Sequence, residues 1–284
     1  MRLASFSIDA KAGWGEIRGD QVFDCSGALG GAYPDLRSAL AADAVANAVA
    51  ESGPGHAIAD ITFLPVVPSP GKIVCVGLNY REHREEAGRA AIEKPTLFMR
   101  APSSQMGHLQ PLVRAPEIEF LDYEGEIAVV IGKPGRRIAE ADAWAHVAGY
   151  APYNDASARD WQGHSSQWTA GKNFDATGGF GPWMATRGAI EDGAALTLET
   201  RVNGQLVQSS DSSRMIFSIP TLIAYVSTFA TLLPGDVIVT GTPSGVGKFR
   251  DPQINLADGD VVEVAVGGVG VLRNRVEVEP RPDI

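Results

Sequence analysis

Residues 122–131 read DYEGEIAVVI, a stretch in which two glutamates open a continuous apolar run. Residues two apart on a strand point to the same face, so Glu124 and Glu126 are expected to project together. An isolated Glu-x-Glu most often lies on a solvated face. Here every following residue is apolar, as in a strand covered on both faces, which is an unfavourable place for free carboxylates. The stretch therefore predicts a buried strand whose paired carboxylates need a proton or a cation.

Strand signals dominate the sequence around this stretch. Two helices are expected, Leu36–Val49 after an N-capping Asp35 and Ile219–Leu233 after Ser218, the second with Val226, Phe229 and Leu233 on its apolar face. This is a β-rich α+β pattern without the regular βα alternation of a doubly wound sheet. The other predicted strands are Ile73–Val76, Thr96–Met99, Val147–Tyr153, Val237–Val239, Val261–Val278 and a hairpin, Leu196–Val207, that turns at Asn203-Gly204.

A proline-rich break divides the chain. Residues 64–71, LPVVPSPG, interrupt any regular element, and we place a domain boundary there. Residues 1–65 are expected to form a small N-terminal α+β domain. Residues 72–280 are expected to form the larger, catalytic domain.

Composition excludes several classes of protein. The net charge of −10 argues against nucleic-acid binding, and no apolar run is long enough to span a bilayer, so no membrane association is expected. Cys25 and Cys75 lie far apart and outside any metal-ligand spacing, which predicts buried free thiols. With no apolar leader at the N-terminus, these features favour a location in the reducing cytoplasm.

A third carboxylate lies in NDASARDWQ, residues 154–162, directly after a predicted strand. Taken alone, Asp155 is most often a turn or cap residue. If it meets Glu124 and Glu126, the three complete an all-oxygen site, which suits Mg²⁺ or Mn²⁺, allows Ca²⁺ and disfavours zinc. Three protein ligands leave positions open for substrate and water.

Two further segments carry groups able to move or stabilise charge. His83 and Glu86 are three residues apart, so on a helix they share a face and can act as an acid/base pair. The alternative is a solvated helix crowded with charge. Lys172 lies in a polar, glycine-rich stretch where a lone lysine is most often on the surface.

The order of these motifs along the chain resembles the fumarylacetoacetate hydrolase family over roughly residues 72–278. The resemblance implies a mixed β-sheet roll, often preceded by a small N-terminal domain and usually assembled as a homodimer. The motifs that carry it are Asn79-Tyr80-x-x-His83-x-x-Glu86, Asp122-Tyr123-Glu124-x-Glu126, Asn154-Asp155-x-Ser157-Ala158-Arg159-Asp160, Gly171-Lys172-x-Phe174-Asp175 and Gly241-Thr242-Pro243-x-Gly245-Val246-Gly247.

The resemblance also implies residue roles. Glu124, Glu126 and Asp155 match the metal ligands, and His83 and Glu86 match an acid/base dyad in a segment that closes over the substrate. The remaining matches are Lys172 as the active-site lysine and Arg159, Gln162, Thr242 and Ser103 as contacts to a small 2-oxo acid substrate.

The reaction that these roles imply is metal-dependent hydrolysis of a C–C bond in a 2,4-dioxo acid, giving pyruvate or a substituted pyruvate and a carboxylic acid. The same residues suit decarboxylation, isomerisation or hydration of a related 2-oxo acid, and a catalytically silent binding protein is the alternative outside enzymes. Departures from the family pattern fall near the substrate: Gly125 between the glutamates, Arg100 where Lys-Pro is common, and Gly178-Gly179-Phe180. They leave the distal half of the substrate open.

Overall fold

Strand β11 (Gly125–Ile131) lies inside the largest sheet and carries the apolar half of residues 122–131. The computed structural model describes residues 1–280, and in it every residue of β11 is buried. Ile127 and Val129 belong to the larger hydrophobic core, whereas Ala128 and Val130 belong to a second core on the opposite face. The strand is covered on both faces, as its uninterrupted apolar sequence predicts.

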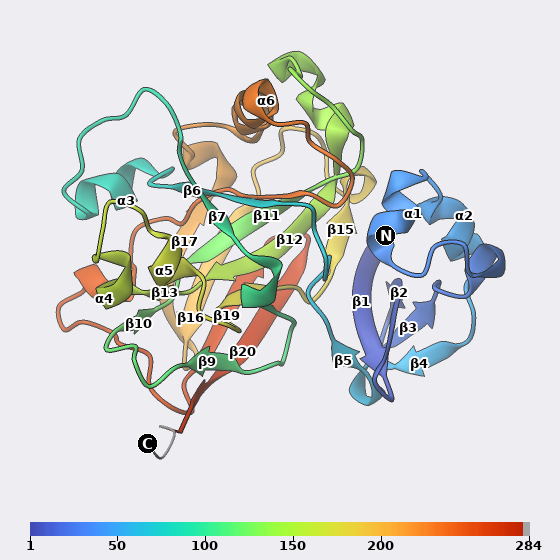
Figure 1. Ribbon diagram of the computed structural model, residues 1–284, viewed down its shortest axis with the longest axis horizontal. Helices are drawn as coiled ribbons and strands as arrows, with labels where there is room; N and C mark the ends of the chain where they lie inside the picture. The colour runs from blue at the N-terminus through green and yellow to red at the C-terminus, as the bar shows by residue number, and fades with distance from the viewer. Residues whose placement is uncertain (281–284) are drawn as a thin grey trace.

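The strands of residues 1–280 form three β-sheets (Figure 1). The main path of the 13-stranded sheet is β4-β3-β2-β1-β15-β12-β11-β18-β6-β7. It is mixed, because β11 is antiparallel to β12 and β18 while β18 is parallel to β6. Its strands are β1 (Arg2–Ile8), β2 (Lys11–Arg18), β3 (Gln21–Asp24), β4 (Gly55–Ala57), β5 (Thr62–Phe63), β6 (Ile73–Gly77), β7 (Thr96–Arg100), β8 (Gln105–Met106), β11, β12 (Val147–Asp155), β14 (Gly178–Phe180), β15 (Met184–Thr186) and β18 (Val237–Val239).

A five-stranded sheet packs against β11 and β12 and encloses the larger core. Its order is β17-β16-β19-β20-β9, and the hairpin β16–β17 turns at Asn203 and Gly204, both with positive φ as the Asn-Gly signal predicts. A two-stranded sheet joins β10 (Leu121–Asp122) to β13 (Ser157–Ala158). The five strands are β9 (Leu112–Arg114), β16 (Thr197–Val202), β17 (Gln205–Asp211), β19 (Val261–Val266) and β20 (Gly270–Val278).

The helix predicted over residues 36–49 is two helices, α1 (Leu36–Ala41) and α2 (Val45–Ala50). Asp35 caps α1 as expected, because its side chain accepts a hydrogen bond from the backbone N–H of Ser38. The break comes at Asp43, whose φ of 53° lies in the left-handed region and cannot continue a helix. The apolar periodicity ran through this break and concealed it.

Helix α6 (Ile219–Phe229) begins at its predicted cap, Ser218, but ends four residues before the predicted Leu233. Val226 is buried as expected, whereas Phe229 is 58% exposed and Leu233 is 41% exposed. The prediction that these two share the apolar face of the helix with the buried Val226 was wrong: Phe229 is the last residue of α6, and Leu233 lies beyond its end, where the chain turns toward β18. The other helices are α3 (Arg81–Glu86), α4 (Arg159–Gln162) and α5 (Thr169–Lys172).

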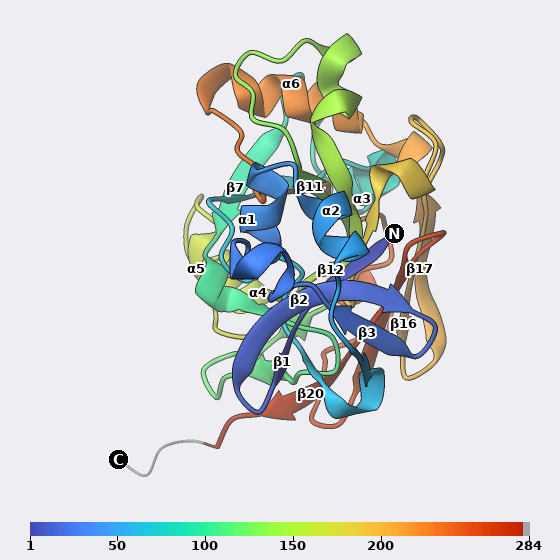
Figure 2. The same cartoon turned by 90° about the vertical axis from the view of Figure 1, so that its right-hand side faces the viewer.

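The N-terminal strands extend the large sheet and do not form a sheet of their own. β1 pairs with β15 through Arg2 opposite Ala185, so residues 1–65 join the rest of the molecule by backbone hydrogen bonds. Figures 1 and 2 show β1–β4 with α1 and α2 gathered on one side of the molecule. The β-rich α+β fold class is confirmed, and the domain boundary near residues 65–72 stays a prediction. Among residues 1–280, no helix is long and apolar enough to cross a membrane.

Candidate metal and acid/base site

Three buried carboxylates meet where β11 and β12 lie side by side. The antiparallel register places Gly125 opposite Asn154, so Glu124, just before β11, and Glu126, on it, come close to Asp155 at the end of β12. One carboxylate oxygen from each lies within 4.8 Å of the other two. The structure brings together all three residues expected to bind the metal.

Two buried cations neutralise part of this charge. The ammonium group of Lys172 lies 2.6 Å from carboxylate oxygens of both Glu124 and Asp155, and the guanidinium of Arg159 lies 2.6 Å from Glu124. Burial opposes the ionisation of Glu124, but the charges of Lys172 and Arg159 outweigh it and hold its pKa well below the ordinary value. Lys172 is therefore part of the site, not a surface lysine.

Glu126 lacks such a partner, which makes the donor set fit a divalent cation. Its carboxylate accepts a hydrogen bond from the backbone N–H of Gly241, and no ion pair involves it among the described residues. Burial, followed by the charges of Asp155 and Glu124, raises the pKa of Glu126 well above its ordinary value. A hard cation such as Mg²⁺ or Mn²⁺ held by these oxygens would neutralise the excess negative charge.

Arg100, on β7, fixes the orientation of Asp155. The guanidinium is fully buried, pairs with one carboxylate oxygen of Asp155 and donates hydrogen bonds to Ser104 and Thr177. Lys172 contacts the other oxygen, so each oxygen of Asp155 has its own cation. Sequence reasoning noted Arg100 only as a departure from the family pattern and missed this role.

The backbone between the two glutamates is held by a network that requires glycine at position 125. Gln208 accepts a hydrogen bond of 3.0 Å from the Gly125 N–H and donates one of 2.8 Å to Thr242, whose hydroxyl donates to the Gly125 carbonyl. A Cβ on Gly125 would lie 1.9 Å from Oγ1 of Thr200. The space that a bulkier residue would need is filled from β16, which explains this departure.

Gly125→Ala is therefore expected to displace both glutamates. The added methyl group overpacks a buried site, at about 1–3 kcal/mol of unfolding free energy. We expect the Mn²⁺ affinity to fall by about tenfold or more. Mutating the residues that orient metal ligands typically lowers metal affinity by about 10–100-fold. Calorimetric Mn²⁺ titration and urea unfolding measure the two effects.

The matched control is Gly188→Ala, where an added Cβ meets nothing within 4 Å. This variant should keep both wild-type values. A Gly125→Ala protein with unchanged Mn²⁺ affinity would contradict the close packing described here.

Asp122 ties the glycine-rich loop after β18 to Arg159. Its carboxylate accepts hydrogen bonds from the backbone N–H groups of Gly247 and Lys248, at 2.7 and 3.0 Å. The same carboxylate pairs with Arg159, at 2.8 Å. Sequence reasoning assigned no role to Asp122; its position two residues before Glu124 was the available signal.

His83 and Glu86 form the expected pair on α3. Nδ1 of His83 lies 3.0 Å from one carboxylate oxygen of Glu86, and the other oxygen accepts a 3.0 Å hydrogen bond from the Gly245 N–H. His83 is buried, unlike a residue of a solvated helix. The start of α3 is held by Asn79, which hydrogen-bonds the backbone of Phe217 and Thr240.

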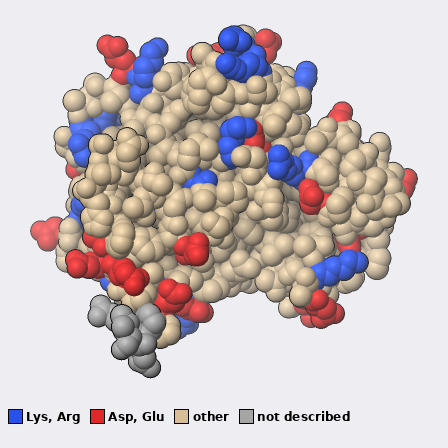
Figure 3. Space-filling view, viewed as in Figure 1, with Lys and Arg blue, Asp and Glu red and all other residues tan. Residues whose placement is uncertain are grey.

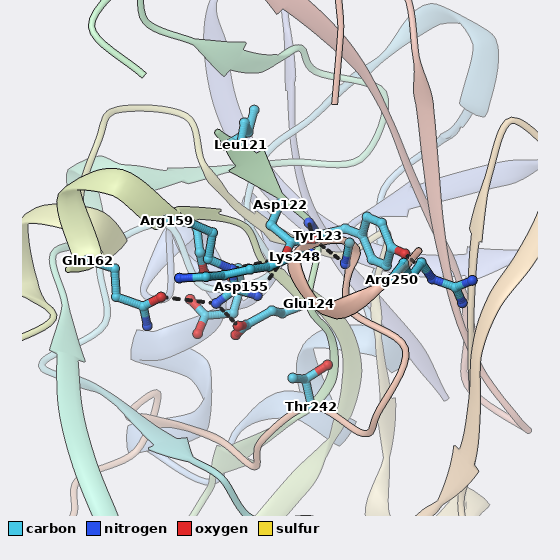
Figure 4. Close-up of polar contacts among 12 residues, drawn as sticks. Leu121, Asp122, Tyr123, Glu124, Asp155, Arg159, Gln162, Thr242, Lys248 and Arg250 are labelled. Carbon is cyan, nitrogen blue, oxygen red and sulfur yellow. Dashed lines mark hydrogen bonds and ion pairs between the residues drawn. The ribbon is translucent and has the colours of Figure 1, made fainter. Parts of the chain in front are cut away.

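One cavity of about 240 Å³ connects these groups. Figure 4 shows Glu124, Asp155, Arg159 and Gln162 grouped together, with Thr242 on the side of Glu124. Gln162 accepts a hydrogen bond of 3.0 Å from Arg159. Ser103 lies elsewhere, exposed on a short 3₁₀ helix outside the cavity lining, while its buried neighbour Ser104 contacts Arg100. The predicted residues that line the cavity are His83, Glu124, Glu126, Arg159, Gln162, Lys172 and Thr242.

Known proteins resemble this chain over most of its length. Residues 72–277 match the model of the fumarylacetoacetate (FAA) hydrolase C-terminal family. The mitochondrial oxaloacetate tautomerase Fahd2a of Rattus norvegicus is 44% identical over 217 residues, which is 76% of this chain and 69% of the relative.

Solved structures share the fold. A fumarylacetoacetate hydrolase from Exiguobacterium antarcticum is 35% identical with a TM-score of 0.87, over 98% of this chain and 100% of that one. A maleylpyruvate hydrolase from Sphingobium sp. SYK-6, solved with manganese(II) and pyruvate, is 29% identical with a TM-score of 0.80, over 99% and 100% of the two chains. The chain belongs to the fumarylacetoacetate hydrolase family.

Proposed function

We propose that the protein is a Mg²⁺- or Mn²⁺-dependent enzyme that interconverts the keto and enol forms of a small 2-oxo dicarboxylic acid of the oxaloacetate type. The observation that carries the proposal is a buried histidine, His83, oriented by Glu86 and lining the same cavity as Glu124 and Glu126, two of the three clustered carboxylates. The rat relative, 44% identical, bears the name oxaloacetate tautomerase, which supports this choice among the family's reactions.

Glu124, Glu126 and Asp155 would hold the cation. A bound Mg²⁺ or Mn²⁺ supplies Lewis-acid stabilisation of negative charge on the oxygens of a 2-oxo acid. Lys172 adds a fixed positive charge in the cavity, and a preorganised charge of this kind is worth about a few kcal/mol to a transition state in which negative charge develops. Arg159 pairs with Glu124 and Asp122, and so places guanidinium N–H donors beside the Glu124 carboxylate.

His83 is the group that would transfer the proton. A carboxylate only accepts hydrogen bonds, so in the neutral form of His83 the proton on Nδ1 would point at Glu86 and Nε2 would carry a free lone pair. Nε2 can accept the proton of the enol hydroxyl and return a proton to carbon 3, which leaves the composition of the substrate unchanged. Glu86, held by the Gly245 N–H, stabilises the imidazolium that forms between these steps.

Hydrolysis of an acylpyruvate is the second candidate. The same Nε2 can remove a proton from water, whose oxygen attacks the distal carbonyl; the C–C bond beside that carbonyl would then break, and the proton would pass to the released carbon to give pyruvate and a carboxylic acid. The maleylpyruvate hydrolase structure with manganese(II) and pyruvate supports this candidate. Decarboxylation and hydration use the same cavity and stay predictions.

Two parallel assays separate the candidates. The first follows enol–keto conversion of oxaloacetate by ultraviolet absorbance, and the second follows pyruvate and acetate released from 2,4-dioxopentanoate. Tautomerase activity that is lost on chelation and restored by Mg²⁺ or Mn²⁺ supports the proposal. Product release from 2,4-dioxopentanoate, with no effect on oxaloacetate, would replace it with the hydrolase.

We also infer a homodimer in the cytoplasm. The dimer rests on the family resemblance, and sedimentation equilibrium tests it through the mass relative to the 30.0 kDa chain. The cytoplasmic location rests on Cys25 and Cys75, which are both buried and free, as in a reducing compartment.

A further inference from the structure

We propose that Lys248 and Arg89 form an anion subsite at the mouth of the cavity, where they bind the distal carboxylate of a dicarboxylic substrate. This inference rests on the proposed function and names the residues that select the substrate's far end. Both side chains line the cavity that Glu126 and Lys172 also line. Lys248 and Arg89 are exposed, whereas Glu126 and Lys172 are buried, so the first pair lies toward solvent and the second in the interior.

The position of Lys248 is fixed by its backbone. Its N–H and that of Gly247 donate to Asp122, which holds the loop against Arg159. In Figure 4 the Lys248 side chain extends beside Arg159 toward Gln162. The exposed Lys248 and the buried Arg159 both line the cavity.

Arg89 reaches the cavity from a different part of the chain. It follows the turn after α3, where Gly88 has a φ of 63° and the Arg89 N–H donates to the Arg84 carbonyl at 3.0 Å. α3 also carries His83, so Arg89 and the proposed proton-transfer group belong to one short segment. A substrate held by Arg89 would bring that segment against the cavity.

Lys248 and Arg89 each carry a positive charge that no carboxylate of the described residues pairs with. Within residues 1–280, neither Lys248 nor Arg89 takes part in an ion pair, whereas Arg159 and Lys172 are each paired with two carboxylates. The whole chain is acidic, with a net charge of −10, so cations gathered at one opening are not a general property of its surface. Figure 3 shows Lys and Arg atoms at the left-hand edge, where Figure 1 places α3 and α4.

The net charge of the buried groups explains why a second carboxylate of the substrate would need Lys248 and Arg89. Asp122, Glu124, Glu126 and Asp155 outnumber Arg100, Arg159 and Lys172 by one. A divalent cation would convert this single negative charge into a single positive charge, which matches one substrate carboxylate. A second carboxylate needs another source of positive charge, and within residues 1–280 the cavity-lining cations without an ion pair are Lys248 and Arg89.

The test compares two acids of equal length, 2-oxoglutarate and 2-oxopentanoate, of which only the first has a distal carboxylate. Calorimetry on the Mn²⁺-loaded protein is expected to show tighter binding of 2-oxoglutarate. Lys248→Met and Arg89→Met should each weaken it by about tenfold, the size of one hydrogen bond to a charged group. Both variants should bind 2-oxopentanoate as the wild type does, and Lys248→Arg should restore binding of 2-oxoglutarate.

Lys11→Met is the matched control, because Lys11 is an exposed lysine on β2, outside the cavity lining. Equal weakening of both acids by Lys248→Met, or no weakening, would overturn the subsite. Equal affinity of the wild type for the two acids would also overturn it and leave the proposed function standing. Binding of neither acid would contradict both.

Discussion

Glu126→Ala is expected to abolish turnover and to weaken Mn²⁺ binding by more than about 100-fold, beyond the 10–100-fold range of groups that only orient ligands. The variant loses one of the three carboxylates that lie within 4.8 Å of one another. Mn²⁺ should raise the melting temperature of the wild type, because a ligand that binds the folded state stabilises it. That increase should disappear in the variant, which thermal unfolding with and without Mn²⁺ measures.

Stability without metal separates loss of the site from loss of the fold. The removed carboxylate is buried beside two others, so its removal relieves charge repulsion, and the metal-free variant should melt no more than a few degrees below the wild type. Glu277→Ala, at an exposed position of β20, controls for loss of a carboxylate elsewhere. Full activity of Glu126→Ala would exclude the metal site described here.

His83→Asn is expected to lower kcat by about 10²–10⁴-fold, the usual contribution of a positioned general acid or base. Mn²⁺ affinity should stay within about twofold of the wild type, because His83 does not belong to the carboxylate cluster. Steady-state kinetics with oxaloacetate and Mn²⁺ calorimetry on the same preparation give the two values.

Glu86→Gln tests the orientation of the imidazole separately. Glutamine keeps the size of the side chain and can still contact His83, but it removes the negative charge that stabilises an imidazolium. We expect a smaller loss of kcat than for His83→Asn. His56→Asn, on β4, is the control, and a His83→Asn enzyme as active as that control would remove His83 from the mechanism.

The carboxylate cluster was predictable because its signals are local. Glu124 and Glu126 are two residues apart before an apolar strand, and Asp155 ends the strand that pairs with it. Burial of that strand on both faces follows from its composition alone. The residues that orient the cluster were not predictable in this way.

Their contacts join distant parts of the chain. Arg100 reaches Asp155 across 55 residues, and Gln208 reaches Gly125 across 83 residues. Each is an ordinary polar residue of a strand in its local sequence, and only the sheet register determines what it contacts. The same limit explains the placement of Ser103, since the buried position belongs to Ser104 one residue later.

The helix errors have a different cause. Hydrophobic periodicity predicts which residues share a helix face. It does not reveal where a helix ends if apolar residues keep the helical spacing past that point. Asp43 interrupts the first helix by its backbone conformation, and Leu233 continues the spacing of the second beyond its end at Phe229.

Deuterium incorporation at carbon 3 of oxaloacetate in D₂O, followed by proton NMR, reports proton transfer at this site. We expect incorporation faster than in buffer, lost on chelation, restored by Mg²⁺ or Mn²⁺, and absent in His83→Asn and Glu126→Ala. Incorporation no faster than in buffer, or unchanged by chelation and by loss of His83, would contradict metal-assisted proton transfer at this site.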